Sequence, residues 1–594
     1  MISRQRLAVL TSLTALGLCA AAPVPASAAA PASVIVSPQP GTVSAMPQTQ
    51  ISFLGAAAGS LSSISVVGSS TGRHSGRLRS YASAAGTSFL PSVPFAAGEQ
   101  VTVHALWRSS TGRRRSVSSS FSVATPVAPP TTEFPPTPGT AADIQGFRSQ
   151  AELHPPAVTV HQAAGTASAP GYLFTAPFLG PGQWGPMIFD SAGNLVWFHP
   201  EATGVDAADL RTQVLHGKND LTWWQGRTII LGYGLGVDVI ADANYRTVAV
   251  VRAGNGLQAD EHEFNVTPQG TAYVLAYSPV QTDLSSVGGS ATGTAVDGVI
   301  QEIDVHTGLV MWEWHSLGHV DISESYSKPP AVATGYYDYF HINSLTTDSH
   351  GNPLISARNT WALYDINHHT GAIMWRLGGK KSTFTLGAGV QFAYQHNAQW
   401  LPNGNISVFD DEGAPPVNPP SRGEVVALDR ANRRATLVTS LVRTIGPVAT
   451  ASQGDVQALP GGGWMIGWGG LPNFTEYNAQ GQIVYDAQLP HGENSYRVYR
   501  LPWSGQPTTP PSIAAVAAAG TSTVYASWNG ATTVASWQLL TGPSTAQLTA
   551  VSTTPRAGFE TTIPAPAASF YEVRALSASG RVLGTSKAVA PTSG

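Results

Sequence analysis

The 594-residue sequence predicts an all-β protein: a six-bladed β-propeller flanked by N-terminal and C-terminal β-sandwich domains, immunoglobulin-like or fibronectin-like in pattern. Three observations predict this class. The 61 glycines and 44 prolines supply many turns. Charged residues make up only 11 % of the chain, which disfavours long exposed helices. The middle of the chain repeats a unit of about four short strands, as propeller blades do.

Residues 1–29 have the pattern of an export signal. Arg4 and Arg6 precede the apolar run "LAVLTSLTALGLCAAA", and "ASA" forms a cleavage site. The two arginines are not adjacent, so this is not a twin-arginine signal, and Leu18 precedes Cys19 where a lipoprotein signal needs a small residue. We expect a Sec-type signal and a secreted, extracellular protein without a lipid anchor. Cys19 is the only cysteine, so the mature chain would contain no disulfide and no thiolate metal site.

Composition also limits the partners. The net charge is −4 and the longest basic run is Arg113–Arg115, so nucleic acid is not an expected partner. Beyond the signal, no apolar run reaches the length of about 18 residues that a membrane span needs. The oligomeric state cannot be predicted.

Strand patterns divide the rest of the chain. Residues 30–124 alternate apolar and polar positions, as in "QVTVHALW", and predict the first β-sandwich. A Pro-rich linker is expected at 125–145, the propeller at 146–504, a second Pro-rich linker at 505–512, and the second β-sandwich at 513–594. Neither outer module carries a chemical motif.

The repeat of the middle segment has two halves. One is strand, Gly turn, strand, as in "FNVTPQGTAYVLAY" and "AQWLPNGNISVFDD", with copies starting near Phe264, Asn343, Asn397 and Asp455. The other ends in a large apolar residue, as in "VIQEIDVHTGLVMWEWH". Earlier copies at "GPMIFDSAGNLVWFHP" and "DLTWWQGRTIILGYG" bring the number of blades to about six.

Polar residues recur just before the first strand of four successive units. They are His262, His341, His396 and Gln453. One such histidine is usually structural, but three in the same place are hard to explain as strand caps, because Ser, Asn or Asp serve that purpose better. The first strands of propeller blades line the central channel, so we expect these side chains to share one site at its mouth.

Hairpin pairing predicts partners for two of the histidines. In "HINSLTTDSHGNPLISAR" the turn places Arg358 opposite His341. In the next unit the Asn-Gly turn at residues 403–404 places Asp411 opposite His396. Asp410 or Asp411 is therefore expected to orient that imidazole and fix its tautomer.

Three imidazoles and a guanidinium suit a tetrahedral anion such as sulfate or phosphate. A neutral histidine can attack such a group or relay a proton, with a carboxylate behind it. Neighbouring aromatic residues, among them Tyr336, Tyr337 and Trp400, could form an apolar wall for an aryl group, although most are expected to pack within blades. No metal site is predicted.

At these residues the chain resembles the bacterial arylsulfate sulfotransferase (arylsulfotransferase) family, whose members do not use the nucleotide sulfate donor and are therefore PAPS-independent. The matching segments are "DEHEF", "FHINSL", "ISARNTWALYDI", "MWRLGG" and "QHNAQWLPNGNISVFDDEG", within about Gly171 to Pro502. The resemblance implies an exported six-bladed propeller with a small β-domain before it. It also implies ping-pong transfer of a sulfuryl group from an aryl sulfate donor to a phenolic acceptor through a sulfohistidine, without a cofactor.

The resemblance also implies roles. His396 would be the nucleophile, His262 an acid/base and anion ligand, and His341 and Arg358 would hold the sulfuryl oxygens. Asn343 would assist in binding the substrate.

Two further substrate-binding residues are predicted from their positions in the repeat and not from the family pattern. Gln453 shares the channel register, and Tyr496 lies in the expected closing strand "SYRVYRLP". The chain departs from the better-studied family members, which carry a disulfide, and its C-terminal sandwich is additional to the pattern. We therefore expect a divergent secreted branch in which the substrate has changed.

Three other functions are considered. A non-catalytic secreted binding or adhesion protein would suit the paired outer sandwiches, and in that case the histidines would not converge. A His-ligated metal hydrolase is disfavoured because no H-E-x-x-H motif occurs. A quinone-dependent propeller dehydrogenase is compatible with the fold, but no adjacent-cysteine or tryptophan-ring repeat is visible.

Overall fold

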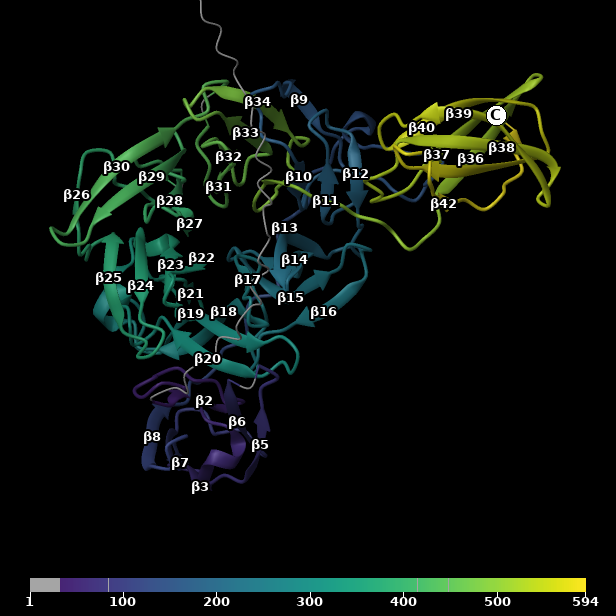
Figure 1. Ribbon diagram of the computed structural model, residues 1–594. Helices are drawn as coiled ribbons and strands as arrows, with labels where there is room; N and C mark the ends of the chain where they lie inside the picture. The colour runs from purple at the N-terminus through teal and green to yellow at the C-terminus, as the bar shows by residue number, and fades with distance from the viewer. Residues whose placement is uncertain (1–32, 84, 414, 447, 594) are drawn as a thin grey trace, which may run out of the picture.

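The computed structural model describes residues 33–83, 85–413, 415–446 and 448–593, so the expected export signal at 1–29 lies outside the described residues. The described chain is all-β, as predicted, with its sheets in three consecutive groups (Figure 1). Helical structure there is confined to five short 3-10 turns: η1 (Ala58–Ser60), η2 (Ala141–Asp143), η3 (Ser285–Val287), η4 (Ile322–Glu324) and η5 (Arg358–Thr360). Across these residues, no helix has the length and apolar character needed to cross a membrane.

The first group consists of two four-stranded sheets that share one core. Phe53 and Phe89 from one sheet pack with Val103 and Phe121 from the other, and all four are buried. Alternating apolar positions produce this arrangement, because successive side chains of a strand point to opposite faces. In sheet order the strands are β1 (Ile35–Ser37), β2 (Ile51–Leu54), β6 (Gly86–Pro91) and β5 (Gly76–Ser80), then β4 (Gly72–Arg73), β3 (Leu61–Gly68), β7 (Gln100–Arg108) and β8 (Arg114–Ser122).

The middle group consists of six sheets. In chain order the first three contain β10 (Tyr172–Thr175), β11 (Met187–Phe189) and β12 (Leu195–Phe198); β13 (Asp206–Leu215), β14 (Lys218–Ile229), β15 (Tyr233–Ala241) and β16 (Thr247–Val251); and β17 (Phe264–Val266), β18 (Thr271–Thr282), β19 (Gly293–Asp304), β20 (Val310–His315) and β21 (Tyr336–Tyr337). The next three contain β22 (Ile342–Thr347), β23 (Pro353–Ala357), β24 (Ala362–Ile366) and β25 (Ile373–Gly378); β26 (Thr385–Leu386), β27 (His396–Trp400), β28 (Ile406–Asp410), β29 (Arg422–Asp429) and β30 (Arg434–Leu441); and β31 (Asp455–Ala458), β32 (Trp464–Gly467), β33 (Asn473–Tyr477) and β34 (Ile483–Gln488).

These sheets surround a common centre, with β17, β22, β27 and β31 nearest to it and β16, β20, β25 and β26 at the outer edges of their sheets (Figure 1). The four inner strands begin within one residue of the predicted starts of the repeat. The six sheets of the middle group are called the ring below. Two strands from distant parts of the chain complete it. β35 (Tyr499–Leu501) pairs with β10, and β9 (Thr159–Gln162) pairs with β34. The first and last sheets of the ring thus each include a strand from the opposite end of the segment, which removes two exposed edges.

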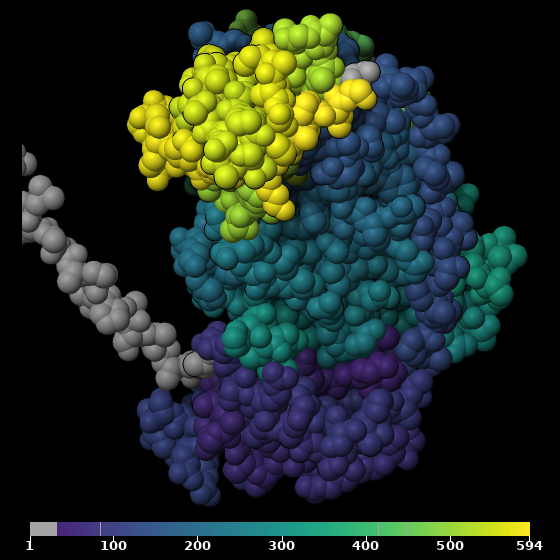
Figure 2. All heavy atoms as spheres, turned by 90° about the vertical axis from the view of Figure 1, so that its right-hand side faces the viewer, coloured from purple at the N-terminus to yellow at the C-terminus, as the bar shows by residue number. Residues whose placement is uncertain are grey.

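The last group again consists of two four-stranded sheets over one core, which includes Trp537, Val573 and Tyr571. Its strands are β40 (Glu560–Pro566), β37 (Thr521–Ser527), β36 (Ser512–Ala518) and β43 (Thr592–Ser593), then β39 (Gln547–Pro555), β38 (Ser536–Ser544), β41 (Phe570–Leu576) and β42 (Val582–Thr585). The carboxamide of Asn529 exchanges hydrogen bonds with the main chain of Phe198 in β12. Figure 2 shows this group and the N-terminal group attached at separate places on the ring.

A buried ionic cluster joins the N-terminal group to the ring. His315 at the end of β20 contacts Asp297 through Nδ1 at 2.7 Å and Glu313 through Nε2 at 3.1 Å. The hydroxyl of Ser44, from the N-terminal group, donates to the same Asp297 carboxylate at 2.6 Å. Burial opposes the charge of the imidazole, but Asp297 and Glu313 outweigh it and raise the pKa of His315 to about 10.

The raised pKa predicts how stability depends on pH. A group whose folded-state pKa exceeds its unfolded value, about 6.5 for histidine, contributes its full stability below pH 6.5. That contribution should be lost as the pH rises through about 10. We expect the melting temperature to fall over this range, and His315→Gln, which leaves buried carboxylates unpaired, to cost about 3–5 kcal/mol at pH 6.5.

Thermal unfolding followed by circular dichroism from pH 6 to pH 10 checks this prediction. The exposed His306 provides the matched control variant, His306→Gln, which should follow the wild type. Identical pH profiles for wild type and His315→Gln would show that the cluster does not stabilise the fold.

Candidate active site

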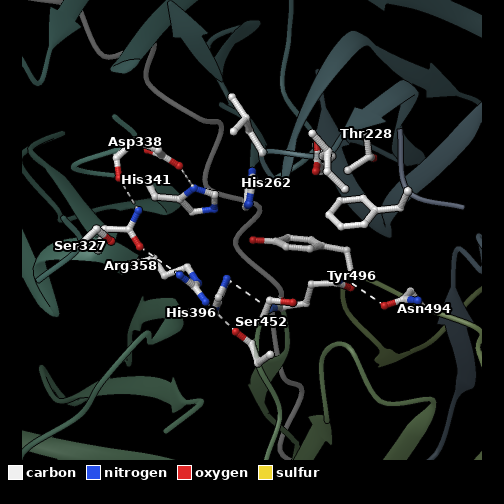
Figure 3. A pocket seen from close by; sticks show the side chains of 18 of the residues that line it. Thr228, His262, Ser327, Asp338, His341, Arg358, His396, Ser452, Asn494 and Tyr496 are labelled. Carbon is white, nitrogen blue, oxygen red and sulfur yellow. Dashed lines mark hydrogen bonds and ion pairs between the residues drawn. The ribbon is translucent and has the colours of Figure 1, made fainter. Parts of the chain in front are cut away.

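A cavity of about 580 Å³ lies where the innermost strands of four successive sheets begin. His262 precedes β17, His341 precedes β22, His396 is the first residue of β27, and Gln453 precedes β31. All four line the cavity, and the imidazoles of the three histidines gather around its centre (Figure 3). The ring centres of His262 and His341 are 5.0 Å apart. This is the convergence that their shared register predicts.

Each of the three histidines has a carboxylate at Nδ1. The partners are Asp260 for His262 at 2.6 Å, Asp338 for His341 at 2.5 Å, and Asp411 for His396 at 2.7 Å. A carboxylate accepts the Nδ1–H and leaves Nε2 as the reactive nitrogen. The sequence prediction included only the last pair. A D-x-H and a D-x-x-H spacing, in "ADEHEF" and "YDYFHIN", could have indicated the other two.

Two of the cavity residues, His341 and Gln453, have a strained backbone conformation. His341 and Gln453 adopt φ angles of 56° and 69°, in the left-handed region that non-glycine residues rarely occupy. This conformation costs on the order of 1 kcal/mol or more at each position and persists where the surrounding structure imposes it. Both residues stand at the turn into an inner strand, so the strain coincides with the residues of the site.

Burial makes His396 a neutral imidazole. Its side chain is 1 % exposed, and burial together with the positive charge of Arg358 holds the pKa of His396 well below its usual value. Burial also lowers the pKa of His262, although Asp260 opposes the shift. Burial raises the pKa of the Asp411 carboxyl well above its ordinary value, although the positive charge of Arg358 opposes the shift.

Arg358 lies opposite His341, as the hairpin pairing predicts. Its main-chain N–H donates to the carbonyl of His341 at 2.8 Å, and the adjacent residues Ile342 and Ala357 are partners across β22 and β23. The guanidinium lines the cavity, donates to the carbonyl of Ala451 at 2.7 Å, and lies over the ring of Tyr394. These contacts fix a cationic group beside His341 (Figure 3).

The predicted pairing of His396 needs a correction. Its backbone partner in β28 is Phe409, not Asp411. The pairs formed by Gln399 and Trp400 already differ from the predicted register by one residue, and a bulge between His396 and Gln399 adds the second. Asp411 lies just beyond the strand, and its side chain reaches the imidazole from there. Asp410 does not contact the imidazole: its carboxylate accepts from Arg422 at 3.0 Å. The orienting residue is therefore Asp411 alone.

The three expected substrate-binding residues differ in position. Gln453 lines the cavity, and its main-chain N–H donates to Nε2 of His396 at 3.2 Å. Tyr496 lines the cavity with its ring, 5.1 Å from that of His262, while its hydroxyl donates to the carbonyl of Asn343 at 2.8 Å. Asn343 is fully buried, is absent from the cavity lining, and donates from its carboxamide to the carbonyl of Gln395. Its side chain thus supports the strands beneath the site, and its expected role in binding the substrate stays a prediction.

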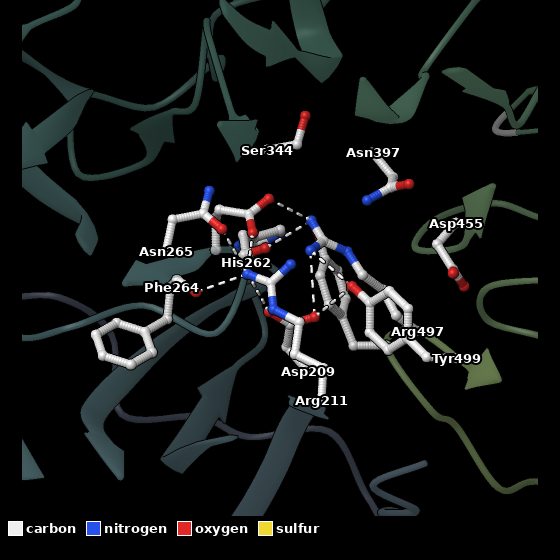
Figure 4. A network of polar contacts seen from close by, with 12 residues as sticks. Asp209, Arg211, His262, Phe264, Asn265, Ser344, Asn397, Asp455, Arg497 and Tyr499 are labelled. Atoms are coloured by element: carbon white, nitrogen blue, oxygen red, sulfur yellow. Dashed lines mark hydrogen bonds and ion pairs between the residues drawn. The ribbon is translucent and has the colours of Figure 1, made fainter. Parts of the chain in front are cut away.

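A buried ionic network that the sequence analysis missed lies under the site (Figure 4). Arg497 donates to the carbonyl of His262 at 2.9 Å and pairs with Glu263 at 2.9 Å and Asp209 at 3.2 Å. Arg211 pairs with the other oxygen of Glu263 at 2.5 Å. Charge pairs this deeply buried are costly to break, so the network fixes the backbone that carries His262. In the sequence, only the position of Arg497 next to Tyr496, in "YRVYR", indicates that it lies near the centre.

One group in the described part of the chain carries potential metal ligands. Asp260, Glu261 and His262 place one ligand atom each within 4.8 Å of one another. The Asp260 oxygen that contacts Nδ1 of His262 also accepts the main-chain N–H of His262 at 3.0 Å. The aspartate and the histidine thus serve each other as partners in the arrangement described.

Three solved structures show weak likenesses to this chain. A protein of unknown function from Bacteroides caccae is 12 % identical, with 55 % of this chain and 98 % of that chain covered and a TM-score of 0.33. A streptogramin B lyase is 10 % identical, covering 56 % and 88 %, with a TM-score of 0.27. A virginiamycin B lyase from Staphylococcus aureus is 10 % identical, covering 63 % and 97 %, with a TM-score of 0.28. None of the curated proteins compared matches the chain.

The family comparison covers the part of the chain that carries the site. The model of the family described as arylsulfotransferase (ASST) matches residues 211–489. This range includes His262, His341, Arg358, His396 and Gln453. This matched range, which supplies the three histidines and Arg358 of the cavity, is therefore similar to the arylsulfotransferase family.

Proposed function

We propose that the protein is an exported, PAPS-independent arylsulfotransferase that moves a sulfuryl group from a phenolic sulfate ester to a phenol through a sulfohistidine at His396. One observation carries the proposal: three imidazoles, each with Nδ1 on a carboxylate, and one guanidinium line the same cavity. The family match supports sulfuryl transfer to and from aryl compounds. The buried, neutral imidazole of His396 supports its assignment as the nucleophile.

In the first half-reaction, Nε2 of His396 attacks the sulfur of the ester. The bond between sulfur and the phenolic oxygen breaks, and its electron pair leaves with that oxygen. Before the reaction, the lone pair of Nε2 accepts a hydrogen bond from the main-chain N–H of Gln453 at 3.2 Å. This hydrogen bond must break before Nε2 can attack. Asp411 balances the charge that forms on the imidazole, because its carboxylate holds the Nδ1 proton.

The remaining groups stabilise charge and move the proton. Arg358 and His341 stand beside one another, where they can bind the sulfuryl oxygens. In the second half-reaction, Nε2 of His262 takes the phenol proton as the acceptor oxygen attacks sulfur. The S–N bond then breaks and returns its electron pair to His396, while Asp260 stabilises the imidazolium of His262. That proton is available for the leaving oxygen of the next donor, and no nucleotide donor is consumed.

We further propose that the six sheets form a six-bladed propeller at 146–504, with β-sandwich domains at 30–124 and 513–594. The two strand exchanges that complete the ring support this division, as do the separate cores of the outer groups. The signal-like pattern at 1–29 supports export.

Replacing the nucleophile tests the mechanism. We expect His396→Gln to lower transfer from a chromogenic aryl sulfate to phenol by at least about a thousandfold, because the proposed intermediate forms on Nε2 of His396. The matched control is His350→Gln, at a histidine whose side chain is 80 % exposed, and it should transfer at the wild-type rate. Activity is measured as release of the coloured phenol without a nucleotide donor, and melting curves verify that both variants fold.

Full activity in folded His396→Gln would reject the nucleophile. Absence of transfer by the folded wild-type protein, with a range of aryl sulfates, would reject the function itself.

The lowered pKa of His396 predicts the pH dependence of the first half-reaction. A histidine with a depressed pKa stays neutral, and therefore nucleophilic, to a lower pH than ordinary histidine with its pKa of about 6.5. We expect the burst of phenol release in a single turnover to keep its rate from pH 7.5 down to about pH 5.5. Stopped-flow absorbance measures this rate, and a decline with an apparent pKa near 6.5 would contradict a neutral buried nucleophile.

A further inference from the structure

The Pro-rich segment between the N-terminal group and the ring is bound along the ring rather than extended as a free spacer. Pro126 bridges to Val280 in β18, and Glu133 bridges to Ile229 in β14. Thr137 donates its main-chain N–H to the carbonyl of Leu179. The segment is therefore attached at successive points to different sheets, and its path follows the end of the ring where the cavity opens.

Phe134 is the residue of this segment that enters the cavity lining. The residues on either side fix its position. The carbonyl of Thr132 accepts the N–H of Ile230 at 2.8 Å, and the carboxylate of Glu133 pairs with Arg227 at 3.2 Å. Phe134 is nevertheless 36 % exposed, so part of a large apolar residue stays uncovered at the edge of the cavity. Burying such a surface against a ligand is favourable.

The apolar lining continues from Phe134 to the ring residues that hold the segment. It consists of Phe178, Leu179, Ile230 and Leu231. Leu179 accepts a hydrogen bond from the segment and Ile230 donates one to it, so this wall and the segment form one unit. Thr228, two residues before Ile230, lies on the other side of Tyr496 from His341 and Arg358 in Figure 3. The cavity thus has an ionic side and an apolar side.

We propose that Phe134 and this apolar wall form a subsite for the carbon skeleton of the substrate, and that the skeleton is an extended aromatic system larger than a single phenol ring. A cavity of about 580 Å³ lies in the range of about 300–1,000 Å³ that takes drug-sized ligands. The ionic side needs only the sulfuryl group, which leaves the apolar side for the skeleton. The inference deepens the function proposed above and rests on it for the sulfuryl chemistry, but binding of the skeleton can be measured without turnover.

Phe134 is accordingly a specificity-determining residue, and it belongs to the Pro-rich segment between the N-terminal group and the ring. Its ring is expected to discriminate between two-ring and one-ring alcohols, because only the larger skeleton reaches from the sulfuryl position to the apolar wall. The full-length mature chain is needed for the test, since the segment connects two sheet groups.

The experiment compares the binding of 2-naphthol and phenol by isothermal titration calorimetry. Phe134→Ala should weaken naphthol binding by about tenfold and phenol binding by less than about twofold, with Phe134→Leu in between. Val127→Ala is the matched control: Val127 lies on the same segment, outside the cavity lining, and its N–H bond to Pro279 does not depend on the side chain. Naphthol should bind this control as it binds the wild type.

Equal losses for naphthol and phenol in Phe134→Ala, no loss for either, or no binding of naphthol by the wild type would each overturn the subsite. Failure of the proposed function is separable, because it would abolish turnover of 2-naphthyl sulfate and leave the naphthol affinities as predicted. Where turnover occurs, Phe134→Ala should raise KM for 2-naphthyl sulfate by about tenfold with kcat within about twofold.

Discussion

The contact between Asp411 and Nδ1 of His396 is the interaction on which the chemistry of the site depends. It fixes the tautomer of a buried imidazole and leaves Nε2 facing the cavity. In the proposed mechanism, this carboxylate balances the charge that a sulfuryl group would place on the buried imidazole. The same solution recurs at His262 and His341, with Asp260 and Asp338 as partners. Repetition of this pair in three successive sheets brings three imidazoles, each with a carboxylate partner, to one cavity.

The closure of the ring gives that site its rigidity. The segment leading to β35 crosses from the last sheet to the first, and on its way it places Tyr496 in the cavity and Arg497 beneath it. Arg497 then links Glu263 and Asp209, which belong to different parts of the ring. The element that closes the fold thus also supports the backbone of His262. Stability and function share one segment here, so changes to it should affect both.

Periodic features could be predicted from the sequence, and features created by local irregularity could not. The strand starts, the all-β class, the convergence of the histidines and the pairing of Arg358 with His341 follow from repeated hairpins. The hairpin register differs from the predicted one by one residue at Gln399, and the bulge between His396 and Gln399 adds a second, which no residue pattern indicates. The Asp338 contact depends on the left-handed turn at His341. The buried contact of Asn343 with Gln395 could not be predicted from the family pattern, on which its expected role rests. The proline content of residues 125–145 predicts a linker. It gives no sign of the backbone hydrogen bonds that attach this segment to the ring of six sheets.

The central claim is that the sulfuryl group passes through His396, and peptide mapping by mass spectrometry tests it most directly. The protein would be mixed with an aryl sulfate in the absence of acceptor, quenched at alkaline pH and digested. The account predicts one added sulfuryl group on the peptide that contains His396, removed when phenol is supplied before quenching. An adduct on His262 or His341 instead, or transfer in solution without any protein adduct, would contradict it.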